Sequence, residues 1–319
     1  TVDTNILLFA KGPAGKAQAL QVGSELPGVE IPLVLMPQSS LNKKGFNLGN
    51  AEVQALKAKI EARGVPLKEW EVKINYGIKT GFNEAFIIDT TTKERLCEQD
   101  PRSAEILKPI LRGRDIKRYG YQWAGLWLIN SHNNPPVKID DYPAIKEHLD
   151  KYYPQLEKRL DQGVTPYNLR NCAYLQEFER EKVVWAEMTD GSSFAWDDTN
   201  MLINQTGYFI PNASKYLLCL LNSKVVYFYF SNIATALGKG AFRWIKQFVE
   251  QIPISQIPQT EQQPFITLVD KILAAKARGE ETSEWERRID ALVFDLYNLT
   301  EEEMLSILQD DKTVSEGDR

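Results

Sequence analysis

Apolar and polar residues alternate along residues 70–78 more regularly than anywhere else in the chain. Such alternation is typical of a β-strand with one buried side and one side in water. The polar loop Lys79–Asn83 follows this stretch, and residues 85–89 are mostly apolar again. We therefore predict a hairpin in which residues 70–78 pair with residues 85–89 and the loop is exposed at one rim. Short polar side chains beside flexible glycines can reach a phosphate or a base edge. The candidates here are Lys79, Thr80 and Asn83.

The remaining patterns predict an α+β fold with a strand-rich, mixed α/β body and a helical C-terminal tail. Apolar residues at helical spacing predict helices over residues 51–62, 142–161, 215–231, 263–278 and 283–297. Short apolar runs between turn residues predict strands over residues 122–129, 182–186, 200–203 and 207–210. We place the body at residues 11–257 and the helical tail at residues 258–309. We expect residues 310–319 to be disordered.

The charge of the chain is unevenly distributed. The net charge is −5, but residues 270–319 hold 14 acidic and 7 basic residues, so residues 1–269 carry a balance of +2. Residues 102–127 hold six basic and two acidic residues. A local basic face of this kind can bind nucleic acid despite a negative total. The chain has no apolar run of about 18 residues, the length of a membrane span, and three widely spaced cysteines. We expect a cytoplasmic protein without a membrane partner.

Basic and aromatic residues are interleaved in two segments, which suits phosphate anchoring combined with stacking or groove contact. The first segment contains Arg112, Arg114, Lys117, Arg118 and Tyr119, and the second contains Lys239, Arg243, Trp244 and Lys246. Arginine can bind guanine, and asparagine or glutamine can bind adenine, with two hydrogen bonds. Arg170 and Asn171, or residues 190–198, are alternative base readers. We predict that the basic residues of these segments and Lys79 converge on one concave face.

Two structural alternatives remain open at this point. Asp115 can pair with Arg112 or Arg118 and fix a turn, and Arg243 can pair with a carboxylate within the fold. In either case the arginine stabilises the protein and does not contact a ligand.

Several of these segments, in this order, resemble a known family. They include Gly77–Ile88, Lys108–Tyr119, Tyr142–Leu149, Thr165–Arg170, Leu220–Lys224, Gly240–Pro253 and Asp290–Leu305. Together they resemble the TaqI-like specificity domain, which is the target-recognition domain of type IIG restriction enzymes and of adenine-specific DNA methyltransferases. Residues 1–10 look like the end strand of a preceding methyltransferase domain.

The resemblance implies a sequence-specific double-stranded DNA recognition module in a restriction-modification enzyme. It implies that the parent protein is an adenine-N6 DNA methyltransferase that uses S-adenosylmethionine, and that Mg²⁺ is needed if an endonuclease is fused to it. The partners implied are double-stranded DNA and a methyltransferase domain before residue 1.

The chain itself lacks the catalytic motifs of such enzymes. Asn134-Pro135-Pro136-Val137 imitates the methyltransferase loop, but Val137 stands where an aromatic residue should stack on the flipped base. We interpret it as a proline-stiffened turn. Glu71 and Lys73 have the spacing of a nuclease site, yet the charged side of an amphipathic strand explains them better. We expect a non-catalytic chain without a cofactor or metal of its own. The alternative function is a protein-interaction or scaffold module that docks onto a partner domain.

Overall fold

A computed structural model describes residues 16–19, 34–37, 51–237 and 240–316, which form two compact units divided after Arg63. Unit 1 contains the antiparallel pair β1 (Lys16–Ala19) and β2 (Val34–Pro37), and helix α1 (Ala51–Arg63). The end strand expected at residues 1–10, Lys239 and residues 317–319 lie outside the described residues. Unit 2 carries the candidate site.

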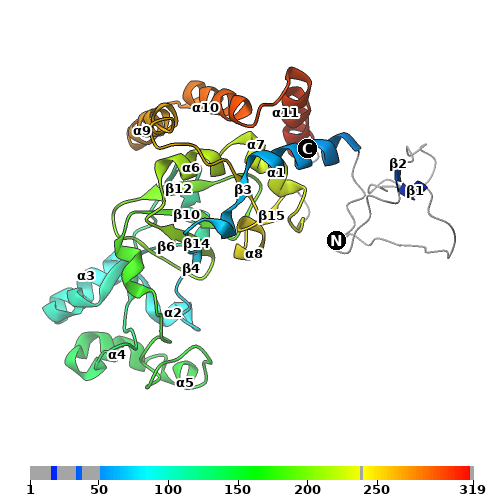
Figure 1. Cartoon of the computed structure of the whole chain (residues 1–319). Coiled ribbons are helices and arrows are strands. Elements are labelled where there is room, and N and C mark those ends of the chain that lie inside the picture. Colours follow the sequence, from blue (N-terminus) through cyan, green and yellow to red (C-terminus); the bar gives the residue numbers. More distant parts are fainter. Residues whose placement is uncertain (1–15, 20–33, 38–50, 238–239, 317–319) are drawn as a thin grey trace. The chain divides into compact units, whose positions relative to one another are not determined.

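Two four-stranded sheets form the body of unit 2 (Figure 1). The first, which is antiparallel, has the order β12 (Phe194–Asp197), β10 (Lys182–Ala186), β14 (Gly207–Pro211) and β4 (Asn75–Tyr76). The second has the order β13 (Leu202–Ile203), β6 (Leu107–Leu111), β9 (Leu126–Ile129) and β5 (Ile87–Asp89), with β13 and β6 parallel. Every residue of β10 is buried, which suits its Val-Val-Trp sequence because a central strand packs on both faces.

Three two-residue ladders close the edges of the body. They are β3 (Val65–Pro66) with β16 (Pro253–Ile254), β7 (Ile116–Lys117) with β8 (Gly120–Tyr121), and β11 (Met188–Thr189) with β15 (Phe242–Arg243). Short 3₁₀ turns connect the elements at Leu67–Glu69, Pro101–Glu105, Gly113–Asp115, Ile139–Asp141 and Leu175–Glu179.

Helices cover the body on two sides (Figure 1). On one side are α2 (Asn83–Phe86), α3 (Thr90–Gln99), α4 (Pro143–Asp150) and α5 (Tyr153–Leu156). On the other are α6 (Lys215–Leu221), α7 (Lys224–Ser231), α9 (Gln263–Ala277), α10 (Ser283–Leu296) and α11 (Glu301–Glu316); the short α8 (Lys246–Val249) follows β15. The tail packs on the body because α9 contacts α6, and α10 and α11 contact α7. None of the helices in the described residues is long and apolar enough to cross a lipid bilayer.

The α+β class is confirmed, and so is a helical tail after the strand-rich body. The predicted tail helices correspond closely to α9 and α10. Helix α11 continues to Glu316, into the segment where we expected disorder.

The predicted hairpin is wrong. Within residues 70–78 only Asn75–Tyr76 is a strand, and it pairs with β14, while β5 pairs with β9. The alternation correctly predicted that Ile74 and Ile78 are buried, but it could not identify the partner strand. The backbone N–H groups of Gly77 and Ile78 donate to the carbonyl oxygens of Gly207 and Ile203, so tertiary contacts hold this segment.

Two long predicted helices are each divided in the structure. Residues 142–161 form α4 and α5, because Pro154 has no N–H to donate to the carbonyl of Asp150. Residues 215–231 form α6 and α7, and Ser223 begins α7 by accepting a hydrogen bond from the N–H of Val226. Both α6 and α7 are buried along nearly their whole length, which suits their many apolar and aromatic residues.

Stability should fall on acidification through His148. Its Nε2 donates to the carbonyl oxygen of Ala85 (3.0 Å), and burial lowers the pKa of the imidazole below its usual 6.5. The neutral ring therefore stabilises the fold above that pH, and the contribution disappears as the pH falls through the folded pKa. We expect the melting temperature to decrease from about pH 8 to about pH 5, and to decrease less in His148→Gln, which keeps a donor. An equal decrease in both proteins would contradict this.

Candidate nucleic-acid interface

The first basic segment begins with a closed turn. The backbone N–H of Arg112 donates to Asp115 Oδ2 (2.8 Å), and its guanidinium pairs with Asp115 Oδ1 (2.7 Å). The side-chain hydrogen bond to Asp115 raises the pKa of Arg112. The structural alternative for Arg112 is therefore confirmed: its main role is to fix this turn. Arg114 and Lys117 are exposed, and their side chains have no ion-pair partner among the described residues, so both stay candidates for DNA contact.

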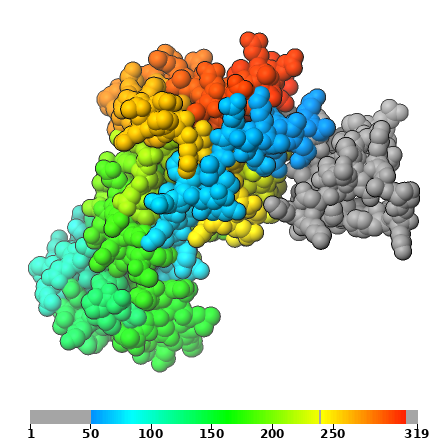
Figure 2. Space-filling view, viewed as in Figure 1, coloured from blue at the N-terminus to red at the C-terminus, as the bar shows by residue number. Residues whose placement is uncertain are grey.

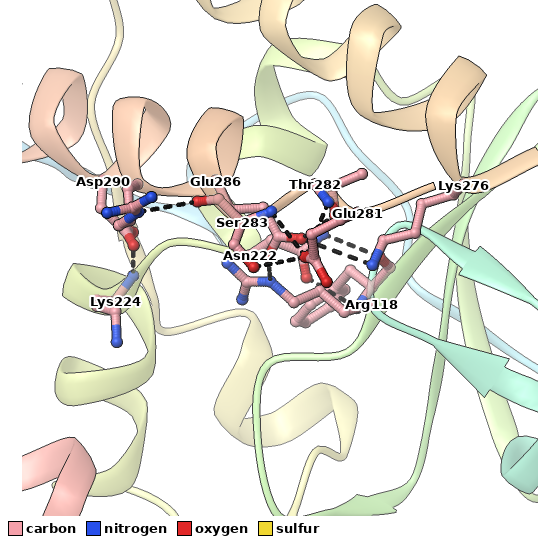
Figure 3. A network of polar contacts seen from close by, with 11 residues as sticks. Arg118, Asn222, Lys224, Lys276, Glu281, Thr282, Ser283, Glu286 and Asp290 are labelled. Carbon is pink, nitrogen blue, oxygen red and sulfur yellow. Dashed lines mark hydrogen bonds and ion pairs between the residues drawn. The ribbon is translucent and has the colours of Figure 1, made fainter. Parts of the chain in front are cut away.

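The side chain of Arg118 binds the helical tail (Figure 3). Its Nε donates to Glu286 Oε2 (2.6 Å), and its guanidinium is 29% exposed. Glu286 also accepts from Thr282 and lies 3.7 Å from the ammonium of Lys276. Nearby on α10, Asp290 accepts the N–H of Lys224 (2.9 Å). Burial raises the pKa of Asp290, whereas that of Glu286 is lowered despite burial, by Arg118 first. We correct the prediction for Arg118: it joins the body to the tail.

Two aromatic residues that we predicted to contact DNA are buried. Tyr119 is 1% exposed, adopts a φ of 64° and donates its backbone N–H to Phe194. Trp244 is 0% exposed and stacks on Phe230, with 3.6 Å between ring centroids. Side chains in these positions cannot stack on a base unless the core opens. Both belong to the scaffold.

Arg243 lies at the surface beside Glu187. Its Nη2 donates to Glu187 Oε1 (2.6 Å), and the side chains are 47% and 20% exposed. The pairing with a carboxylate, which was our structural alternative, is therefore present. A surface pair of this kind contributes only about 0–1 kcal/mol, so a phosphate can displace Glu187. Lys246 is exposed.

The Lys79–Asn83 loop is only partly exposed. Thr80 is 1% exposed, and its hydroxyl donates to Asn83 Oδ1 (2.6 Å), so the prediction that Thr80 faces a ligand needs correction. Asn83 is half-exposed, and its contact with DNA stays a prediction. Lys79 remains accessible, with its ammonium 5.4 Å from the ring centroid of Tyr76.

The buried guanidinium of Arg159 holds this loop in place. It donates to the carbonyl oxygens of Thr80 (2.5 Å), Asp161 (2.5 Å), Pro166 (3.0 Å) and Asn168. Burial lowers the pKa of Arg159 to about 10, so the group stays charged at neutral pH. Arg159 therefore links the Lys79 loop to residues 161–168. The sequence offered no signal for this role, because its partners are carbonyl groups of distant segments.

Arg170 pairs with Asp161 (2.9 Å) at the end of this second loop and is half exposed. Asn171 beside it is exposed. The hydroxyl of Tyr174 donates to the carbonyl oxygen of Tyr76, and the two rings meet edge to face at 5.8 Å. The segment around Arg170 therefore adjoins β4.

Two of the predicted basic segments contact one turn, Asn204–Gly207, between β13 and β14, and the segment of Arg243 is linked to it through Glu187. Ile78 bridges to Asn204, the N–H of Gly113 donates to Thr206 Oγ1 (2.8 Å), and the N–H of Glu187 donates to the carbonyl oxygen of Thr206 (2.9 Å). A Cβ on Gly77 would lie 1.9 Å from the carbonyl oxygen of Asn204, so this approach requires glycine.

This turn presents Gln205 and Thr206 to solvent, and Lys79 and Arg114 each follow a residue that contacts it. We did not predict Gln205 from the sequence, although the amide of a glutamine can bind adenine with two hydrogen bonds. The polar run between two predicted strands was the available signal. The structure thus brings the segments of Lys79 and of Arg112 and Arg114 to one turn, links Arg243 to it through Glu187, and places Arg118 at the tail.

The Asn134-Pro135-Pro136-Val137 segment forms a turn in which Asn133 and Pro136 bridge. This agrees with our interpretation of the segment as a proline-stiffened turn.

Comparison with known proteins agrees with the sequence motifs. Residues 108–254 match the TaqI-like C-terminal specificity domain family. The type II methyltransferase M.MjaIV of Methanocaldococcus jannaschii is 22% identical over 240 residues, which cover 71% of this chain and 79% of that protein.

Among solved structures, the type IIL restriction-modification enzyme MmeI in complex with DNA aligns with 78% of this chain at a TM-score of 0.60 and 13% identity. The type IIG restriction endonuclease BpuSI aligns with 84% at a TM-score of 0.47 and 14% identity. This chain spans only 36% of either of those chains. The likeness to MmeI shows a shared fold. Over residues 108–254 the chain therefore carries a TaqI-like specificity domain, the target-recognition part of restriction-modification enzymes.

Proposed function

We propose that this chain recognises a specific sequence in double-stranded DNA on behalf of a restriction-modification enzyme. The observation that carries the proposal is the Asn204–Gly207 turn with its exposed Gln205. The segments of Lys79 and Arg114 contact this turn, and Arg243 is linked to it through Glu187. Basic groups anchor phosphates, and an amide can identify a base by paired hydrogen bonds. The family match of the residues that contain this turn supports the same assignment.

The parent enzyme that we propose is an adenine-N6 DNA methyltransferase with S-adenosylmethionine as methyl donor, and with Mg²⁺ where an endonuclease is fused. The residues assigned above bind and position DNA in this proposal. The catalytic chemistry belongs to a methyltransferase domain, which is the proposed protein partner. The proposed location is the cytoplasm, where such an enzyme meets DNA.

Gln205→Ala provides a direct test of base reading. After selection of bound duplexes from a random pool, the wild-type chain should enrich a defined sequence, and the variant should lose preference at one base pair. The expected cost on the selected site is about 1–3 kcal/mol, with little change on random duplex. Gln259→Ala, which changes an exposed glutamine of the tail region, is the matched control.

Binding to random duplex at low and high salt distinguishes DNA recognition from the scaffold alternative. Each phosphate contact should lower log K by about 0.9 per unit of log salt. Absence of salt-dependent binding by the folded chain would reject the DNA proposal and favour a protein-docking module.

A further inference from the structure

A hollow of about 300 Å³ opens on unit 2 between the residues that follow β3 and helix α8. Figure 2 shows these two segments side by side on the viewed face, the first in blue and the second in yellow. Three of the lining residues are lysines, Lys68, Lys73 and Lys246, and one is a carboxylate, Glu250. The rest of the lining is Leu67, Val72, Ile74 and Asn75.

The backbone holds the lysines around the hollow. The N–H of Leu67 donates to the carbonyl oxygen of Ile252 (2.9 Å), and the N–H of Lys68 donates to that of Glu250 (2.8 Å). The β3–β16 pairing continues this contact. The segment of Lys68 and the segment of α8, which carries Lys246, are therefore fixed next to each other although they are widely separated in sequence.

The positive charge of the residues that line the hollow exceeds their negative charge. All three lysine side chains are exposed, and none makes an ion pair or hydrogen bond with another side chain in the described ranges. Most arginines of the candidate interface differ: Arg112, Arg170 and Arg243 each have a carboxylate partner. Glu250 alone offsets three ammonium groups. Like charges held together without counter-charges attract an anion.

The hollow adjoins the face on which Gln205 lies. Asn75 lines the hollow, and the next residue, Tyr76, pairs with Tyr208 at the start of the strand that leaves the Asn204–Gly207 turn. On the other wall, Lys246 lies three residues after Arg243 in the sequence. A DNA strand whose bases contact the turn therefore has a cationic surface beside it.

We propose that the Lys68–Lys73–Lys246 hollow binds a phosphate group, and that its source is the DNA backbone next to the bases read at the Asn204–Gly207 turn. The backbone source rests on the proposed DNA-recognition function, whereas the affinity for phosphate does not. An ammonium is a compact, flexible point charge that suits a phosphate contacted without sequence preference.

The test compares the triple variant K68A/K73A/K246A with the wild-type chain on random-sequence duplex at several salt concentrations. The slope of log K against log salt should become shallower by about 0.9 for each lysine that contacts a phosphate, up to about 2.7 in total. The loss should be equal on random duplex and on the selected site. The control K138A/K151A/K271A removes the same charge at exposed positions outside the hollow and should leave the slope less changed.

Glu250→Gln provides a prediction of opposite sign, because it removes the only negative group of the hollow while keeping its shape. Binding to random duplex should become tighter. An unchanged slope in the triple variant, together with unchanged binding in Glu250→Gln, would overturn the backbone assignment. Unaltered melting temperatures would show that the variants are folded.

Calorimetry with sodium tripolyphosphate distinguishes the two sources of phosphate. If the triple variant loses tripolyphosphate binding but keeps the wild-type DNA slope, the hollow binds a free phosphate compound and the backbone source is wrong. If the triple variant binds both tripolyphosphate and DNA as the wild-type chain does, the hollow is not a phosphate site. A wild-type chain that binds tripolyphosphate in the hollow but no DNA would reject the proposed function without rejecting the phosphate site.

Discussion

Asp197→Ala should lower the free energy of unfolding by about 3–5 kcal/mol, because it leaves a buried lysine without its counter-charge. Lys182 and Asp197 form an ion pair of 2.5 Å, and both side chains are 0% exposed. The carboxylate also accepts hydrogen bonds from the hydroxyls of Tyr121 (3.0 Å) and Thr199 (2.7 Å) and from the N–H of Met201 (3.2 Å). Burial lowers the pKa of Lys182, and Asp197 opposes that effect. Urea denaturation monitored by tryptophan fluorescence would measure the loss.

Two comparisons make this prediction specific. The double variant K182M/D197N removes both charges and keeps an acceptor for Thr199, so we expect it to be more stable than Asp197→Ala despite the additional change. Arg278→Ala breaks an exposed pair with Glu280, which water screens, so its effect on stability should be far smaller than that of Asp197→Ala. An equal loss of unfolding free energy in Asp197→Ala and Arg278→Ala would show that the buried pair stabilises the fold no more than an exposed pair does.

Arg159→Ala should destabilise the protein by about 3–5 kcal/mol, because its four carbonyl acceptors lose a charged donor. The guanidinium also lies over the ring of Phe86, with its carbon 4.5 Å from the centroid. Since it ties the Lys79 loop to residues 161–168, the remaining folded molecules should bind DNA more weakly. Thermal unfolding and DNA titration of the same sample would measure both effects.

Arg159→Lys is the informative companion. The ammonium keeps the charge but lacks the planar fork that reaches two loops, so we expect only partial recovery of stability. Arg114→Ala is the matched control for stability, since that side chain is exposed and makes no ion pair within the described residues. If Arg159→Ala has the same melting temperature as the wild-type chain, the two loops keep their positions without the Arg159 side chain.

The sequence by itself determined which segments are apolar and which are polar, and several of the helices. The α+β class, the helical tail and the buried α6–α7 region follow from apolar spacing, which depends on neighbours a few residues away. The family motifs correctly indicated a specificity domain over residues 108–254. Arg114, Lys117 and Lys246 lie at the surface, as charged side chains without partners must.

Only the tertiary structure decided which segments meet. The sequence could not tell that Tyr76 pairs with Tyr208 or that Arg118 binds Glu286, 168 residues away. Nor could it separate Tyr119 and Trp244, which fill the core, from the exposed Gln205, Lys68 and Lys73. The physical reason is that strand pairing, ion pairing and burial depend on groups brought together from distant parts of the chain, whereas local patterns specify only what each segment can offer.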